Sequence, residues 1–157
     1  MNFPDGAITD RERCLICQSD DAPDSAVVFR DDLWACEVTP GFEVPGWYVL
    51  RVRRHALGWA ELAPNELREY GQRLQDIVTS VTEVFQSPAT YVMSFGEAYP
   101  HYHCLIAARG TDVPPDRRVS NIMTLRQDRL NRDRSLDFVP AVRAAYLAKT
   151  MKSGARP

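Results

Sequence analysis

The sequence predicts an α+β fold, with an antiparallel sheet of about five strands, one long helix and a helical C-terminal extension. Segments rich in β-branched and aromatic residues lie both before and after a single long amphipathic stretch. This order of strands, helix and strands favours a mostly antiparallel sheet. The chain has 157 residues, of which 45% are hydrophobic and 25% charged, which suits one domain with a full core.

Three strands are expected before the helix. The segments AVVFR (26–30) and LWACEV (33–38) are separated by two aspartates, so they predict a hairpin or a bent pair. A loop with two Pro-Gly type breaks (39–47) follows them and leads into the third strand, WYVLRV (47–52).

The long helix is expected over residues 62–86, where apolar side chains recur at three- and four-residue spacing. Pro64 or Asn65 can begin this helix, and Ser87 followed by Pro88 ends it. It is the clearest single element that the sequence predicts.

Two more strands are expected after the helix, TYVMSF (90–95) and HYHCLIAA (101–108). A proline-rich loop, an arginine-rich stretch and a last helix come next. The extension is expected to be helical and to pack on the domain. We therefore divide the chain into a lead-in (1–13), a main domain (14–110) and a C-terminal extension (111–157).

Composition and charge argue against several classes of protein. The 19 basic and 21 acidic residues give a net charge of −2, unlike the basic field of most duplex-binding proteins. No apolar run approaches the roughly 20 residues that span a bilayer, and the first residues lack the apolar stretch of a signal peptide. We therefore expect a cytoplasmic protein with reduced cysteines that binds neither a nucleic-acid polymer nor a membrane.

A Cys-x-x-Cys unit opens the main domain at Cys14 and Cys17. Such a unit can be a redox pair, half of a zinc site or two buried small residues, and the strands that follow it disfavour a redox pair. Two more ligands would complete a tetrahedral structural zinc site, and His55 and His101 are the candidates. A loop histidine exposed to solvent and a half-buried strand histidine are the simpler interpretations of these two residues.

Two histidines and a leucine, His101, His103 and Leu105, stand two residues apart in an apolar run. In a strand their side chains would all lie on one face. The run from Gly96 to Arg109 resembles the signature of the histidine-triad family, Gly-Gln-x-φ-x-His-φ-His-φ-His-φ-Ile-Pro-Arg, where φ is apolar. The Cys-x-x-Cys unit, the first strands and the long helix are similar in order to the same family, so the resemblance covers roughly residues 14–110.

The resemblance implies a fold, a chemistry and an assembly. It implies the α+β histidine-triad fold, usually as a homodimer whose sheets join, in which the extension would pack on its own domain or on the dimer partner. The substrates would be nucleotides or dinucleoside polyphosphates, cleaved or transferred at the α-phosphorus by His103 as the nucleophile. Gly96 and Arg109 would contact the substrate, and Glu37 is the nearest candidate for the acid that holds the ribose hydroxyls. The zinc-bearing branch of the family would use the set Cys14, Cys17, His55 and His101.

The chain also departs from the family pattern. The third triad position is Leu105, which cannot donate a hydrogen bond to a phosphoryl oxygen. Glu97 stands in place of a glutamine, Ala98 in place of a hydroxyl residue and Ala108 in place of a proline. A slipped register with Tyr99 as the first triad position is a minor alternative.

These departures leave three functions open. The first is a nucleotide phosphoramidate or dinucleoside polyphosphate hydrolase, or a nucleotidyltransferase, slowed by the missing donor. The second is a catalytically degenerate zinc-stabilised domain that binds a nucleotide or a protein partner. The third, outside the family, is a zinc-stabilised interaction domain for an acidic partner. Arginines of the extension, Arg118, Arg126 or Arg129, can replace the missing donor or simply form a solvated helix face.

Overall fold

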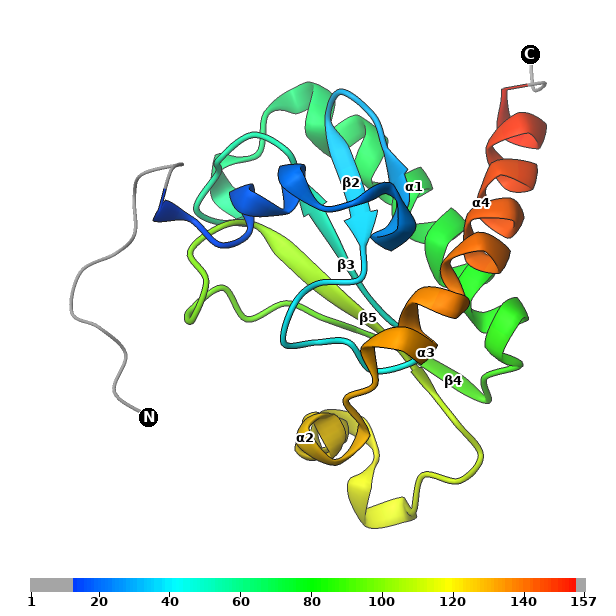
Figure 1. The fold of residues 1–157 in the computed structure, drawn as a ribbon. Coiled ribbons are helices and arrows are strands. Elements are labelled where there is room, and N and C mark those ends of the chain that lie inside the picture. The colour runs from blue at the N-terminus through cyan, green and yellow to red at the C-terminus, as the bar shows by residue number, and fades with distance from the viewer. Residues whose placement is uncertain (1–12, 155–157) are drawn as a thin grey trace.

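The computed structural model describes residues 13–154 and has one five-stranded antiparallel sheet (Figure 1). The strand order is β1-β2-β3-β5-β4, and every neighbouring pair is antiparallel. The strands are β1 (Val27–Arg30), β2 (Trp34–Glu37), β3 (Trp47–Val52), β4 (Ala89–Met93) and β5 (His103–Arg109). The predicted α+β class and its antiparallel sheet are confirmed. Within residues 13–154, no helix is both long and apolar enough to cross a bilayer.

The long helix α1 (Pro64–Phe85) covers one face of the sheet. Pro64 lies in its first turn, and the carboxylate of Glu66 accepts a hydrogen bond from the Ala63 backbone N–H at 2.7 Å. Gln86 adopts a left-handed conformation with φ 47°, which ends the helix. Its apolar stripe, which includes Ile77 and Val81, packs into the main core.

The C-terminal extension contacts both faces of the sheet. Its first part packs Val113, Ile122 and Leu125 against the face that α1 leaves open. The short helices α2 (Arg126–Arg129) and α3 (Arg132–Asp137) then lead to α4 (Val139–Ser153), which lies beside α1 (Figure 1). The division of the chain into a domain and an extension stays a prediction, since both parts contribute to the same two cores.

Strand β5 begins at His103, two residues later than the sequence suggested. The backbone N–H of Tyr102 instead donates to the Ala56 carbonyl, so the chain joins the ladder only at the pair His103–Arg51. His101 therefore lies outside the strand, and its ring has different neighbours from that of His103. The expectation of three side chains on one strand face is wrong for His101.

Candidate functional site

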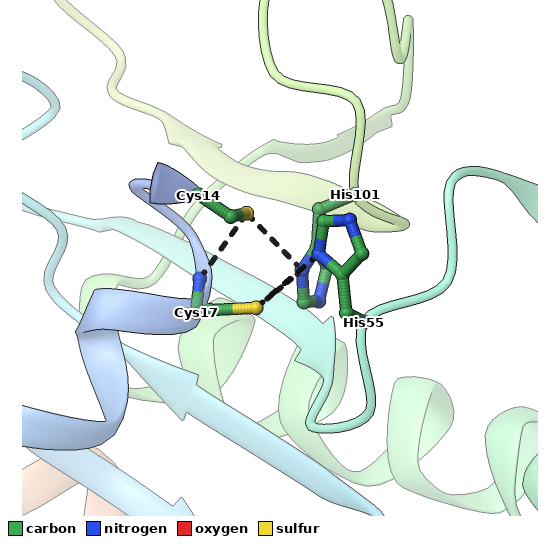
Figure 2. A group of neighbouring side chains, drawn as sticks. All are labelled: Cys14, Cys17, His55 and His101. Carbon is green, nitrogen blue, oxygen red and sulfur yellow. Dashed lines mark hydrogen bonds between the residues drawn. The ribbon is translucent and has the colours of Figure 1, made fainter. Parts of the chain in front are cut away.

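Two cysteines and two histidines from three parts of the chain meet at one point (Figure 2). Cys17 is the first residue of the short 3-10 helix η2 (Cys17–Asp21), and Cys14 lies just before the turn that leads into it. His55 follows β3, and His101 precedes β5. The Sγ atom of Cys17 lies 3.3 Å from Nδ1 of both histidines, and Sγ of Cys14 lies 3.5 Å from Nδ1 of His101. All four ligand atoms lie within 4.8 Å of one another.

This geometry fits a zinc ion. Zinc–sulfur bonds of about 2.3 Å and zinc–nitrogen bonds of about 2.0 Å place tetrahedral sulfur and nitrogen ligands about 3.5 Å apart. Nε2 of His101 lies 2.6 Å from the Val52 carbonyl, which can only accept, so Nε2 carries the proton and Nδ1 is free to bind metal. Burial lowers the pKa of His101 to about 4, so its ring is neutral at pH 7. The four residues form a zinc site, as the sequence predicts.

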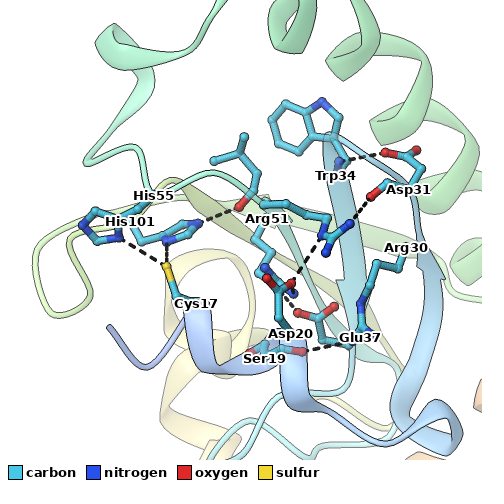
Figure 3. Close-up of polar contacts among 12 residues, drawn as sticks. Cys17, Ser19, Asp20, Arg30, Asp31, Trp34, Glu37, Arg51, His55 and His101 are labelled. Carbon is cyan, nitrogen blue, oxygen red and sulfur yellow. Dashed lines mark hydrogen bonds and ion pairs between the residues drawn. The ribbon is translucent and has the colours of Figure 1, made fainter. Parts of the chain in front are cut away.

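A buried ionic network holds η2 against the sheet (Figure 3). The carboxylate of Asp20 lies 2.8 Å from the Arg51 guanidinium and 3.3 Å from that of Arg53. Arg51 also pairs with Glu37, and both of these side chains are fully buried. Burial raises the pKa of Glu37, although Arg51 opposes that shift. Because η2 carries Cys17, this network fixes the position of a metal ligand.

His103 lies in a cavity of about 840 Å³ on the face of the sheet opposite α1. Its Nδ1 atom lies 2.6 Å from the His101 carbonyl oxygen, which can only accept, so Nδ1 carries the proton. The lone pair of the neutral ring is therefore on Nε2. Burial lowers the pKa of His103, which keeps the ring neutral near pH 7. A neutral imidazole held in one tautomer is suited to act as a nucleophile.

The cavity walls include η2, the β2–β3 loop, the β4–β5 loop and the C-terminal extension. The guanidinium of Arg126 lies 4.8 Å from the ring centre of Phe42. The Phe42 ring lies 6.5 Å from that of Tyr99, which in turn lies 6.2 Å from the His103 ring. Tyr99 also packs against the Cys14–Cys17 segment, so one aromatic side chain contacts both the zinc site and the cavity.

The structure brings some of the predicted substrate-binding residues to His103 and separates others. Gly96 lines the same cavity, as do Glu97, Ala98 and Leu105. Arg109 lies at the far end of β5 and lines a second cavity of about 560 Å³. Glu37 lines neither cavity, because its carboxylate is buried against Arg51.

The three arginines proposed as replacement donors also differ in position. Arg126 lines the His103 cavity. Arg129 pairs with Asp112 at 2.9 Å in the second cavity, and Arg118 donates to the Val113 carbonyl at 3.0 Å. The sequence analysis considered Tyr99 only as an alternative triad position and did not identify Phe42, although both residues line the cavity. No sequence pattern distinguishes Phe42 from the rest of its loop.

Comparisons with known proteins support the fold. No family model and no curated protein matches the sequence. A hypothetical histidine triad nucleotide-binding protein from Sulfolobus tokodaii matches the structure with TM-score 0.69 and 13% identity, over 90% of this chain and 97% of that chain. A Zn-bound histidine triad family protein from Mycobacterium smegmatis matches with TM-score 0.64 and 17% identity, over 92% of this chain and 99% of that chain.

A uridylyltransferase has a similar domain. It matches with TM-score 0.62 and 15% identity over 86% of this chain, which spans 45% of that chain. At these identities the likeness establishes the fold rather than the activity. The five-stranded antiparallel sheet and its helices agree with this fold, and one of the similar structures is zinc-bound. The chain thus has the fold of the histidine-triad proteins.

Proposed function

We propose that the protein is a histidine-triad family member that binds a nucleotide in the His103 cavity. The observation that carries this proposal is the hydrogen bond from Nδ1–H of His103 to the His101 carbonyl, which leaves Nε2 unprotonated. The cavity volume of about 840 Å³ is within the range of small-molecule sites. Two structurally similar proteins, a hypothetical histidine triad nucleotide-binding protein and a uridylyltransferase, support the same class of ligand.

The proposed reaction has two steps at the α-phosphorus. Nε2 of His103 attacks phosphorus, a nitrogen–phosphorus bond forms, and the bond to the leaving group breaks. The leaving group takes a proton from water, and a second water or another acceptor then attacks the nucleotidyl-histidine. Release of the nucleotide restores the neutral imidazole. Attack by water makes the protein a phosphoramidate or dinucleoside polyphosphate hydrolase, and attack by another acceptor makes it a nucleotidyltransferase.

Arg126 is the proposed substitute for the donor that Leu105 lacks. Loss of one preorganised donor costs about 10²–10³ in turnover, so a compensating charge matters. Arg126 lines the cavity, and within residues 13–154 no ion pair joins its guanidinium to a carboxylate. Glu97 and Asp21 also line the cavity, and their negative charges would repel a phosphate. The positive charge of Arg126 would reduce this repulsion.

The test is incubation with a nucleotide panel that includes adenosine 5′-phosphoramidate, followed by mass spectrometry for a nucleotidylated His103. We expect the adduct in the wild type, none in His103→Asn, and at least tenfold less in Arg126→Met. Arg68→Gln, an exposed change on α1, is the matched control and keeps the adduct. Equal hydrolysis by wild type and His103→Asn would refute the catalytic proposal.

The second candidate is a domain that binds a nucleotide or a protein partner without catalysis. Leu105 favours it, because its buried side chain offers no donor beside His103. In that case calorimetry detects nucleotide binding to both wild type and His103→Asn, and neither protein forms an adduct.

We also propose a homodimer in the cytoplasm. Edge strand β4 pairs on one side only, and its Val92 is exposed, so a second copy can extend the sheet there. Thiolate ligands for zinc suit a reducing compartment. Light scattering tests the assembly: a mass of two chains is expected, and Val92→Lys on the edge strand should shift it to one.

A further inference from the structure

The second cavity lies at the opposite end of β5 from His103. At about 3.3 Å per residue, the strand separates the Cα atoms of His103 and Arg109 by about 20 Å. Among the described residues, none lines both cavities. Anything that binds in the second cavity therefore binds apart from the proposed nucleophile.

Arginine side chains dominate the charge of this second cavity. Its lining includes three arginines, Arg109, Arg129 and Arg134, and two aspartates, Asp112 and Asp128. Arg129 forms an ion pair with Asp112 at 2.9 Å, so the charges of these two side chains cancel.

Arg109 and Arg134 have no carboxylate partner within residues 13–154. The Arg109 guanidinium donates to the neighbouring Gly110 carbonyl at 3.4 Å, and that of Arg134 lies 5.9 Å from the Phe138 ring centre. The two positive charges of Arg109 and Arg134 exceed the single negative charge of Asp128, so the cavity has a net charge of one positive unit. A guanidinium is an effective binder of phosphate and carboxylate oxygens, so the cavity favours an anion.

Most of the remaining wall residues are apolar or aromatic, although Ser87 and Asn131 also line the cavity. Trp47 and Leu125 belong to the smaller core of the protein, and Phe85 and Phe138 lie with ring centres 4.6 Å apart. The cavity volume of about 560 Å³ exceeds the needs of a bare ion and is within the range of small organic ligands. Charge and wall together fit a molecule with an anionic group and an apolar body.

We propose that this cavity is a second ligand site, which binds a small organic oxyanion. Arg109 and Arg134 hold its phosphate or carboxylate group, and its aromatic or aliphatic body lies against Trp47 and Phe138. This role also gives Arg109 a function at its observed position, where it is too far from His103 to contact the same phosphate.

The experiment is a nuclear magnetic resonance titration of the ¹⁵N-labelled full chain with phenyl phosphate, phenylacetate and the neutral benzyl alcohol. The indole N–H of Trp47 reports on the second cavity, and the backbone N–H of Gly96 reports on the His103 cavity. We expect a saturable shift of the Trp47 signal with at least one anion and none with the alcohol. The anion that binds more tightly identifies phosphate or carboxylate as the preferred group.

Variants locate the binding charge. Arg109→Gln and Arg134→Gln should each weaken the anion by about tenfold, and Arg68→Gln on the exposed face of α1 should not change it. Because Arg134 is exposed, its variant tests the site even where Arg109→Gln does not fold. The proposal is overturned if neither anion shifts Trp47, if the shift occurs only at Gly96, or if Arg134→Gln binds as tightly as the wild type.

Discussion

At the residue scale, His101 links the metal site to the cavity through two separate atoms. Its ring nitrogen Nδ1 lies beside both cysteines, while its backbone carbonyl accepts the proton of His103 Nδ1. A substitution of His101 removes the first contact and keeps the second, because every residue has a carbonyl. The two neighbouring histidines therefore have separable effects on metal binding and on the cavity.

Replacement of either histidine should affect the protein differently. We expect His101→Ala to lose zinc and to melt well below the wild type, because metal binding contributes directly to the free energy of folding. His103→Ala should keep about one zinc per chain and a melting temperature near that of the wild type. Elemental analysis of protein purified without a histidine tag and thermal unfolding measure both effects. Equal melting temperatures, or a wild type without zinc, would contradict the assignment.

Leu105 offers a test by gain of activity. It lines the His103 cavity, so Leu105→Gln places an amide donor where the triad pattern has a hydrogen-bonding side chain. We expect the yield of nucleotidyl-His103 to rise by about tenfold or more, with some loss of stability from the buried amide. Leu105→Met, which adds no donor, is the control. A Leu105→Gln protein no faster than Leu105→Met would show that the missing donor does not limit the reaction.

At the element scale, α4 behaves as part of the main core. Its buried side chains Val139, Val142 and Tyr146 belong to the same cluster as α1 and the sheet. The ring of Tyr146 stacks on that of Phe29 in β1, with centres 4.2 Å apart and planes 5° apart. The extension is therefore expected to stabilise the sheet as a whole.

Truncation of one α4 side chain tests this expectation. Tyr146→Ala should lower the free energy of unfolding by about 3–5 kcal/mol, because it leaves a cavity between α4 and β1. Met151→Ala, on the exposed side of the same helix, should change it by less than about 0.5 kcal/mol. Urea unfolding followed by circular dichroism provides both values. Similar values for the two variants would mean that α4 folds apart from the sheet.

At the scale of the whole molecule, the sequence predicted elements better than long-range partners. The boundaries of β3 were predicted at 47–52, because a short run of buried β-formers is a local signal. The zinc ligands were predicted because only a few residue types bind zinc and the chain has three histidines.

What the sequence did not show depends on tertiary contacts. The ion pair between Glu37 and Arg51 joins β2 to β3. This pair buries the Glu37 carboxylate away from the cavity, and no local sequence pattern indicates it. Likewise, the motif run places Arg109 near His103 in sequence, whereas an extended strand separates them in space. The position of Arg126 follows from how the extension crosses the open face, which its weak periodicity did not reveal.

The part of the extension that crosses the open face has one further consequence. Along residues 122–127, side chains line one cavity or the other in turn: Ile122 and Leu125 line the second, and Met123 and Arg126 line the one that holds His103. Because this segment separates the two cavities, it cannot move toward one of them without moving away from the other. A ligand that displaces this segment from one side would therefore alter the cavity on the other side, and by linkage the resulting change in affinity would be the same in both directions.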